Sequence, residues 1–177
     1  MNAVTLRGIA TTEAGFVVLL DCAAQKLTVP IAIGSSEAQA ILIELKGMEF
    51  PRPLTHDLLR NVLTELGATL AKVEVTELRD DTFFAVLHLD GPGGRVTVDA
   101  RPSDAMALAL RCRAPILVAD DVLAKAGIGL DQDGSPAAAA TAPPADPVSD
   151  LKAKLEQAIA AERYEEAARL RDQLREL

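Results

Sequence analysis

Tryptophan is absent from this chain of 177 residues, and aromatic side chains make up only 3% of it. Apolar residues nevertheless reach 49%, so any core must be built mainly from aliphatic side chains. No stretch approaches the roughly 20 consecutive apolar residues that a membrane-spanning helix needs. We therefore expect no membrane partner, and the length suits one medium-sized domain with an appendage.

Cysteine is also scarce. Cys22 and Cys112 both lie inside apolar runs and match no metal-ligand spacing, so we interpret them as small thiols in a reducing compartment. The N-terminal stretch MNAVTLRGIATTEAG has no basic segment followed by an apolar core and a cleavage site, so no secretory signal is expected. These features predict a cytoplasmic protein.

Positively charged residues are fewer than negatively charged ones. Lys and Arg number 18 against 26 Asp and Glu, which gives a formal net charge of −8. The chain has no basic tail and no run of Lys or Arg. The usual electrostatic signature of nucleic-acid binding is therefore missing, and this counts against a function on DNA or RNA.

The composition changes sharply at residue 129. Residues 129–149 (GLDQDGSPAAAATAPPADPVS) are rich in Gly, Pro, Ala and Asp and predict a flexible linker. Residues 150–177 (DLKAKLEQAIAAERYEEAARLRDQLREL) have leucines at helical spacing and predict an α-helical hairpin. Two short helices bury too little apolar surface to be stable alone, so we expect this hairpin to pack against a second copy or a protein partner.

The remaining segment, residues 1–128, contains an internal duplication. Residues 15–43 align without gaps on residues 82–110 at a constant offset of 67, so that Phe16 falls on Phe83 and Ser36 on Ser103. Each copy has the pattern of a strand, a turn, a second strand and a helix, and a further strand precedes each one. The sequence therefore predicts an α+β domain of two three-strand-plus-helix units, which form a mixed sheet with packed helices.

An insertion between the two copies carries a helix of its own. Apolar residues recur there at helical spacing, namely Leu58, Leu59, Val62, Leu63 and Leu66. Thr55 follows a Pro-rich lead-in and is the predicted N-cap. Arg52, His56 and Asp57 stand at the entrance of this helix. The other histidine, His88, falls in a strand alternation and is expected at the surface.

The second copy differs from the first in its polar residues. Where the first copy has Ala32 and Gly34, the second has Asp99 and Arg101. Strand alternation would place both side chains of the second copy on one face, beside a helix N-terminus that could hold an anion. A simple ion pair on the sheet surface and a functional site both fit this pattern.

Ser103 and Asp104 directly follow this pair. A serine N-cap with an acid in the first turn explains them structurally, because it satisfies free amides and favours the positive end of the helix dipole. The corresponding Ser36 and Glu37 of the first copy have the same pattern. Both a capping role and a place in a site stay open for Ser103.

Three segments together resemble the bifunctional nuclease family, over roughly residues 3–128. They are VPIAIGSSEAQAI, FPRPLTHDLL and VDARPSDAMALALR, in that order and spacing. The tail, with AIAAERYEEAARLRDQL, resembles the UVR motif of the UvrB and UvrC repair proteins. The first resemblance implies hydrolysis of phosphodiester bonds in DNA and RNA. The second implies a protein-interaction hairpin, and we expect a homo-oligomer.

The resemblance also implies a set of site residues. The implied catalytic residues are His56, Asp57, Asp99 and Asp104, and the implied substrate-binding residues are Arg52, Arg101 and Ser103. Either Asp99 and Asp104 bind a divalent cation (Mg, Mn or Ca) that activates water, or His56 serves as the base. A different class of function is a non-catalytic regulatory or adaptor protein, in which this cluster binds a protein or a small anionic ligand.

Overall fold

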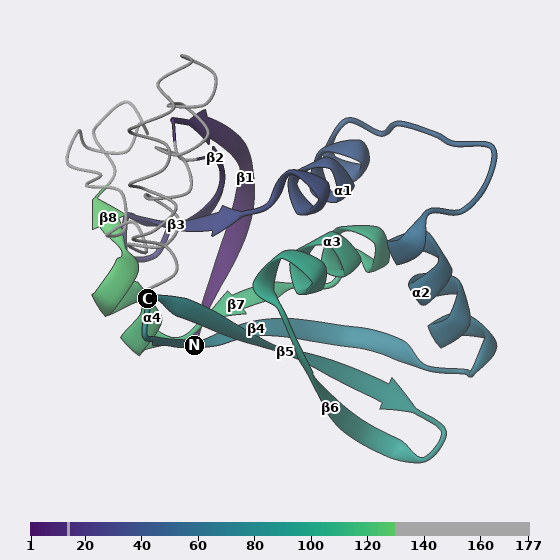
Figure 1. Ribbon diagram of the computed structural model, residues 1–177. Helices are drawn as coiled ribbons and strands as arrows, with labels where there is room; N and C mark the ends of the chain where they lie inside the picture. The colour runs from purple at the N-terminus through teal and green to yellow at the C-terminus, as the bar shows by residue number, and fades with distance from the viewer. Residues whose placement is uncertain (14, 130–177) are drawn as a thin grey trace, which may run out of the picture. The chain divides into compact units, whose positions relative to one another are not determined.

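A computed structural model describes residues 1–13 and 15–129, and all of the strands in these residues belong to one mixed sheet (Figure 1). The strands are β1 (Asn2–Thr12), β2 (Gly15–Cys22), β3 (Leu27–Ile33), β4 (Thr69–Arg79), β5 (Thr82–Gly91), β6 (Gly94–Ala100), β7 (Ile116–Val118) and β8 (Ile128–Gly129). Their order is β6-β5-β4-β7-β1-β2-β3-β8. The pair β4 and β7 is parallel, and the other neighbours are antiparallel.

The helices of the described residues are α1 (Ser35–Leu45), α2 (Thr55–Glu65), α3 (Pro102–Cys112) and α4 (Asp120–Ala126). Helix α3 lies between α1 and α2 and packs against both of them (Figure 1). None of these helices has the length and apolar character that crossing a membrane requires. The predicted α+β class with a mixed sheet is confirmed for this part. Gly129, the first residue of the predicted linker 129–149, instead ends strand β8, and the rest of that linker and the predicted hairpin lie outside the described residues.

The two predicted units have the same strand order. The series β1-β2-β3 and β4-β5-β6 run outward from the two sides of the central strand β7. Leu6 pairs with Leu20 in the first unit, and Val73 pairs with Leu87 in the second, each 67 residues further along the chain. This equivalence in strand order and register supports the duplication that the sequence predicts.

The outer hairpins differ in register. In the first unit the hairpin turn takes residues 23–26, and Leu20 pairs with Val29. In the second unit the turn takes only residues 92–93, and Leu87 pairs with Val98 instead of Val96. A displacement of two residues leaves every side chain on its own face of the sheet. The core nevertheless differs between the units, because Val29 on β3 is buried whereas Val96 and Val98 on β6 are exposed.

The core lies between the sheet and helices α1, α3 and α4. Its largest fully buried side chains are aliphatic or sulfur-containing, and they include Leu20, Ile41, Met106, Leu108 and Leu123. This matches the expectation of an aliphatic core. Burial of such side chains is the main stabilising contribution, at about 1.5–3 kcal/mol for each large one.

The predicted N-caps were wrong by one or two residues. The residues in the capping position of α1, α2 and α3 are Gly34, Leu54 and Arg101, and none of them caps with its side chain. Ser103 is instead the second residue of its helix, because Pro102, with its fixed φ and missing amide proton, occupies the first position.

Helix α2 presents most of its apolar side chains to solvent. No residue of α2 is buried, and Leu58, Leu59 and Val62 are exposed. Of the apolar residues that predicted this helix, only Leu63 packs partly against the core. Polar contacts must therefore supply much of what holds α2 in place, and these contacts lie at the site described next.

Candidate functional site

A cleft of 610 Å³ lies where the first turns of α1, α2 and α3 meet. Its lining combines Glu37, Gln39 and Phe50 with three residues that the sequence singled out, His56, Arg101 and Asp104. Charged, amide and aromatic groups from separate elements thus converge on one hollow. Such a combination is typical of ligand-binding sites.

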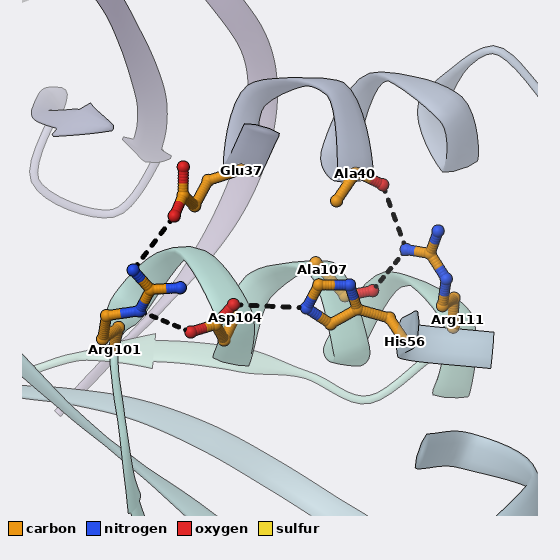
Figure 2. A network of polar contacts seen from close by, with 7 residues as sticks. All are labelled: Glu37, Ala40, His56, Arg101, Asp104, Ala107 and Arg111. Carbon is orange, nitrogen blue, oxygen red and sulfur yellow. Dashed lines mark hydrogen bonds and ion pairs between the residues drawn. The ribbon is translucent and has the colours of Figure 1, made fainter. Parts of the chain in front are cut away.

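Asp104 is at the centre of the polar network in this cleft (Figure 2). One carboxylate oxygen, Oδ2, accepts a hydrogen bond from Arg101 Nε at 2.7 Å. The other, Oδ1, lies 3.3 Å from His56 Nε2, a long hydrogen bond. A carboxylate is therefore shared between an imidazole on α2 and a guanidinium at the start of α3.

The surroundings of Asp104 keep its carboxyl group ionised. Burial alone would raise the pKa of Asp104, but Arg101 and His56 lower it, so that the pKa lies below its usual value. An ionised carboxylate only accepts hydrogen bonds. The His56 nitrogen that faces it, Nε2, must then carry a proton, and in a neutral imidazole the second nitrogen, Nδ1, is free to accept one.

Arg101 joins the two units of the fold. Its Nη1 lies 2.9 Å from Glu37 Oε1 on α1, in addition to the bond with Asp104. Glu37 and Asp104 occupy the same position in their helices, 67 residues apart. The sequence alignment paired these two acids but did not assign Glu37 to the site. The side chain of Arg101 is 66% exposed and is the cation of this network most accessible to a ligand.

Arg111 is a buried residue that lines the cleft. It was not identified from the sequence as a site residue. Its side chain is 1% exposed and its Nε donates to Asp57 Oδ1 at 2.7 Å. One signal was available, since the 67-residue offset places Arg111 on Glu44, a residue of opposite charge. An arginine directly after the apolar run AMALAL was the second signal.

Asp57 lies beside the cleft and stabilises the first turn of α2. Its Oδ1 takes the bond from Arg111, and its Oδ2 accepts from the Leu54 amide at 2.9 Å, which closes the first turn of α2. Burial would raise the pKa of Asp57, but the Leu54 amide and Arg111 lower it, and the net shift is downward. Both oxygens are engaged, so Asp57 ties the first turn of α2, which carries His56, to α3.

Three other predicted site residues lie elsewhere. Asp99 is exposed and pairs with Val86 on β5, which places it on the sheet face opposite to the buried Leu87. Arg52 is exposed and does not line the cleft. Ser103 is buried within α3. The alternation that joined Asp99 to Arg101 does not hold, because the strand ends at Ala100.

The two predicted cation ligands, Asp99 and Asp104, do not converge on one site. In residues 1–13 and 15–129, no group of three or more His, Cys, Asp or Glu side chains could hold a metal ion. Both oxygens of Asp104 already accept hydrogen bonds, and Asp99 does not line the cleft. We therefore derive no chemical step through a metal here.

His88 is not the surface residue that the sequence predicted. Its Nε2 lies 2.7 Å from Glu74 Oε2, and Lys72 Nζ donates to the other oxygen of Glu74 at 2.6 Å. Lys72 first, and then His88, lower the pKa of the largely buried Glu74 against the opposing effect of burial. The Glu74 carboxylate is paired within this cluster, and none of its three residues lines the cleft.

Several known proteins are similar to this chain. It is 47% identical over 123 residues to the uncharacterized protein Rv1829 of Mycobacterium tuberculosis, which covers 70% of this chain and 73% of the relative. It is 28% identical over 167 residues to bifunctional nuclease 1 of Arabidopsis thaliana and 26% identical over 166 residues to bifunctional nuclease 1 of Oryza sativa subsp. indica. Each of these matches covers 84% of this chain and about half of the plant protein.

Two family models also match. The bifunctional nuclease domain matches residues 17–131, which include every residue of the cleft, and the UvrB/UvrC motif matches residues 146–177. The chain therefore belongs to the bifunctional nuclease domain family and carries a UvrB/UvrC motif after that domain.

Proposed function

We propose that this protein hydrolyses phosphodiester bonds of DNA and RNA in the cleft formed by the first turns of α1, α2 and α3. The observation that carries the proposal is the shared carboxylate of Asp104, which contacts an imidazole and an exposed guanidinium at once. Membership of the bifunctional nuclease domain family and the similarity to plant bifunctional nucleases suggest nucleic acid as the substrate class.

The proposed roles follow from the chemistry of each group. His56 acts as the general base through Nδ1, since Nε2 is held by Asp104. A water oxygen forms a bond to phosphorus while its proton passes to Nδ1, and the phosphorus–oxygen bond to the leaving alkoxide breaks. The imidazolium then returns a proton to that alkoxide, with Asp104 stabilising the transient positive charge.

Arg101 is the proposed contact for the phosphate. Its guanidinium matches two phosphate oxygens and would stabilise the negative charge that grows on them during attack. In the structure its donors bind Glu37 and Asp104, so a phosphate would exchange with one of these carboxylates. Glu37 is the partner we expect to yield, because Asp104 also orients His56.

A cleavage assay tests the proposal directly. Purified full-length protein is incubated with end-labelled single-stranded DNA and RNA in EDTA and, separately, in Mg²⁺, Mn²⁺ and Ca²⁺. We expect cleavage of both polymers in at least one of these conditions. Cleavage in EDTA would support the His56 route, while cleavage only with a cation would require a metal route. The absence of cleavage in every condition would favour the adaptor function and contradict the proposal.

We also propose that the UvrB/UvrC motif in residues 146–177 mediates association with a second copy or another protein. Deleting residues 130–177 is expected to leave a folded domain and to lower the oligomeric state or abolish partner binding. The cut follows Gly129 because that residue pairs with Leu27 on β3. Light scattering coupled to gel filtration gives the oligomeric state, and circular dichroism gives the fold. An unfolded truncated chain would show that the segment belongs to the core.

A further inference from the structure

We propose that Arg111 is a positioning residue of the cleft, because its guanidinium holds α1 and α2 against α3. The kinetic part of this inference rests on the proposed function, but the structural part does not. Arg111 touches the backbone or side chains of all three helices that build the cleft. Figure 2 shows its bonds to the carbonyls of Ala40 on α1 and Ala107 on α3, and its third partner is Asp57 on α2.

Three hydrogen bonds define this position. Arg111 Nε donates to Asp57 Oδ1 on α2 at 2.7 Å. Its Nη1 donates to the Ala40 carbonyl of α1 at 3.1 Å and to the Ala107 carbonyl of its own helix at 2.9 Å. The partners stand one residue from His56 and three residues from Glu37, so the same guanidinium fixes the elements that carry both cleft residues.

Because Arg111 is buried, water cannot replace these hydrogen bonds when one of their partners is removed. Its side chain is 1% exposed, and a buried cation must be paired and fully hydrogen-bonded to be tolerated. Helix α2 has no buried residue of its own and depends on few apolar contacts. The ion pair with Asp57 is therefore a principal link between the first turn of α2 and the rest of the domain.

The guanidinium group is specifically suited to this position. Its planar fork directs Nε toward one partner and Nη1 toward two others. A lysine ammonium is a single charged atom on a flexible stem, and it could pair with Asp57 without also reaching the two carbonyls. An Arg111→Lys variant should therefore keep the positive charge but lose the hydrogen bonds to the Ala40 and Ala107 carbonyls.

Hydrogen exchange and steady-state kinetics of the full-length protein test the inference. Arg111→Met and Arg111→Lys are expected to speed amide exchange in residues 55–65 by about tenfold or more, with the smaller change in the lysine variant. Asp57→Asn is expected to speed exchange in α2 while leaving α1 unchanged, since it weakens the link to Arg111 and the bond from the Leu54 amide, both at the first turn of α2. The kcat for cleavage is expected to fall by about tenfold with a smaller change in KM, because displacement of His56 affects the chemical step.

Arg7→Met is the matched control. Arg7 also has a carboxylate partner, Asp21, at 2.6 Å, but it is an exposed residue on β1 and does not line the cleft. This variant is expected to change neither exchange in α2 nor kcat. If exchange in α2 rises no more in Arg111→Met and Arg111→Lys than in Arg7→Met, the inference is wrong. A wild-type chain without cleavage would contradict the proposed function alone, and the exchange comparison would still decide the role of Arg111.

Discussion

Asp104→Asn is expected to lower the rate of DNA and RNA cleavage by roughly 10²–10⁴-fold. The amide keeps the shape of the carboxylate but removes the negative charge that holds both Arg101 and His56. Its NH₂ group is a donor where both neighbours also donate. His56 is then free to adopt the other tautomer, in which Nδ1 carries the proton and no longer accepts one.

The change in stability should be small by comparison. The side chain of Asp104 is partly exposed, and such ion pairs contribute about 0.2–1 kcal/mol. Initial rates on a labelled oligonucleotide and a thermal melt of the same preparation separate the two effects. A large fall in rate with a nearly unchanged melting temperature is the expected result.

Asp90→Asn provides the matched control. Asp90 accepts from Arg95 Nε at 2.8 Å, nearly the same geometry as the Asp104 pair, but it lies on β5 and does not line the cleft. We expect its cleavage rate to stay within about twofold of wild type, as for an ordinary surface substitution. Full activity in the Asp104→Asn variant would place the chemistry outside this cleft.

Leu20→Ala is expected to lower the free energy of unfolding by about 2–5 kcal/mol. Leu20 lies on β2 with 0% of its side chain exposed, where it pairs with Leu6 and Val29 and belongs to the aliphatic core. Truncation removes buried methyl groups and leaves a cavity that rigid strands on both sides cannot close. Urea unfolding followed by circular dichroism measures the loss.

Two further leucines calibrate this measurement. Leu87 occupies the equivalent place on β5 and is nearly as well buried, so Leu87→Ala should cost a similar amount. Leu58 on α2 is 57% exposed, and Leu58→Ala should change the free energy of unfolding by no more than about 0.5 kcal/mol. Equal losses for Leu20→Ala and Leu58→Ala would contradict the described packing.

Local patterns in the sequence predicted many of the elements of the described domain. Helical spacing predicted the helix that became α2, and strand and helix patterns predicted the three strands and the helix of each unit. The 67-residue offset predicted two units of the same strand order, which the sheet contains. These features depend on near neighbours along the chain, and near neighbours are visible in a sequence. The same spacing could not show that α2 turns its leucines toward solvent, because that depends on which partner each face meets.

The composition of the cleft was decided by tertiary structure. The contacts that build it join residues 48, 54 and 71 positions apart, and they arise only when α1 and α2 pack on α3. That packing brought in Glu37 and Arg111, and the end of β6 at Ala100 left Asp99 on the other face of the sheet. Local propensity determines what each segment becomes, while burial of the shared core determines which polar side chains of the cleft meet, because residues so far apart in the sequence come within bonding distance only when their helices pack.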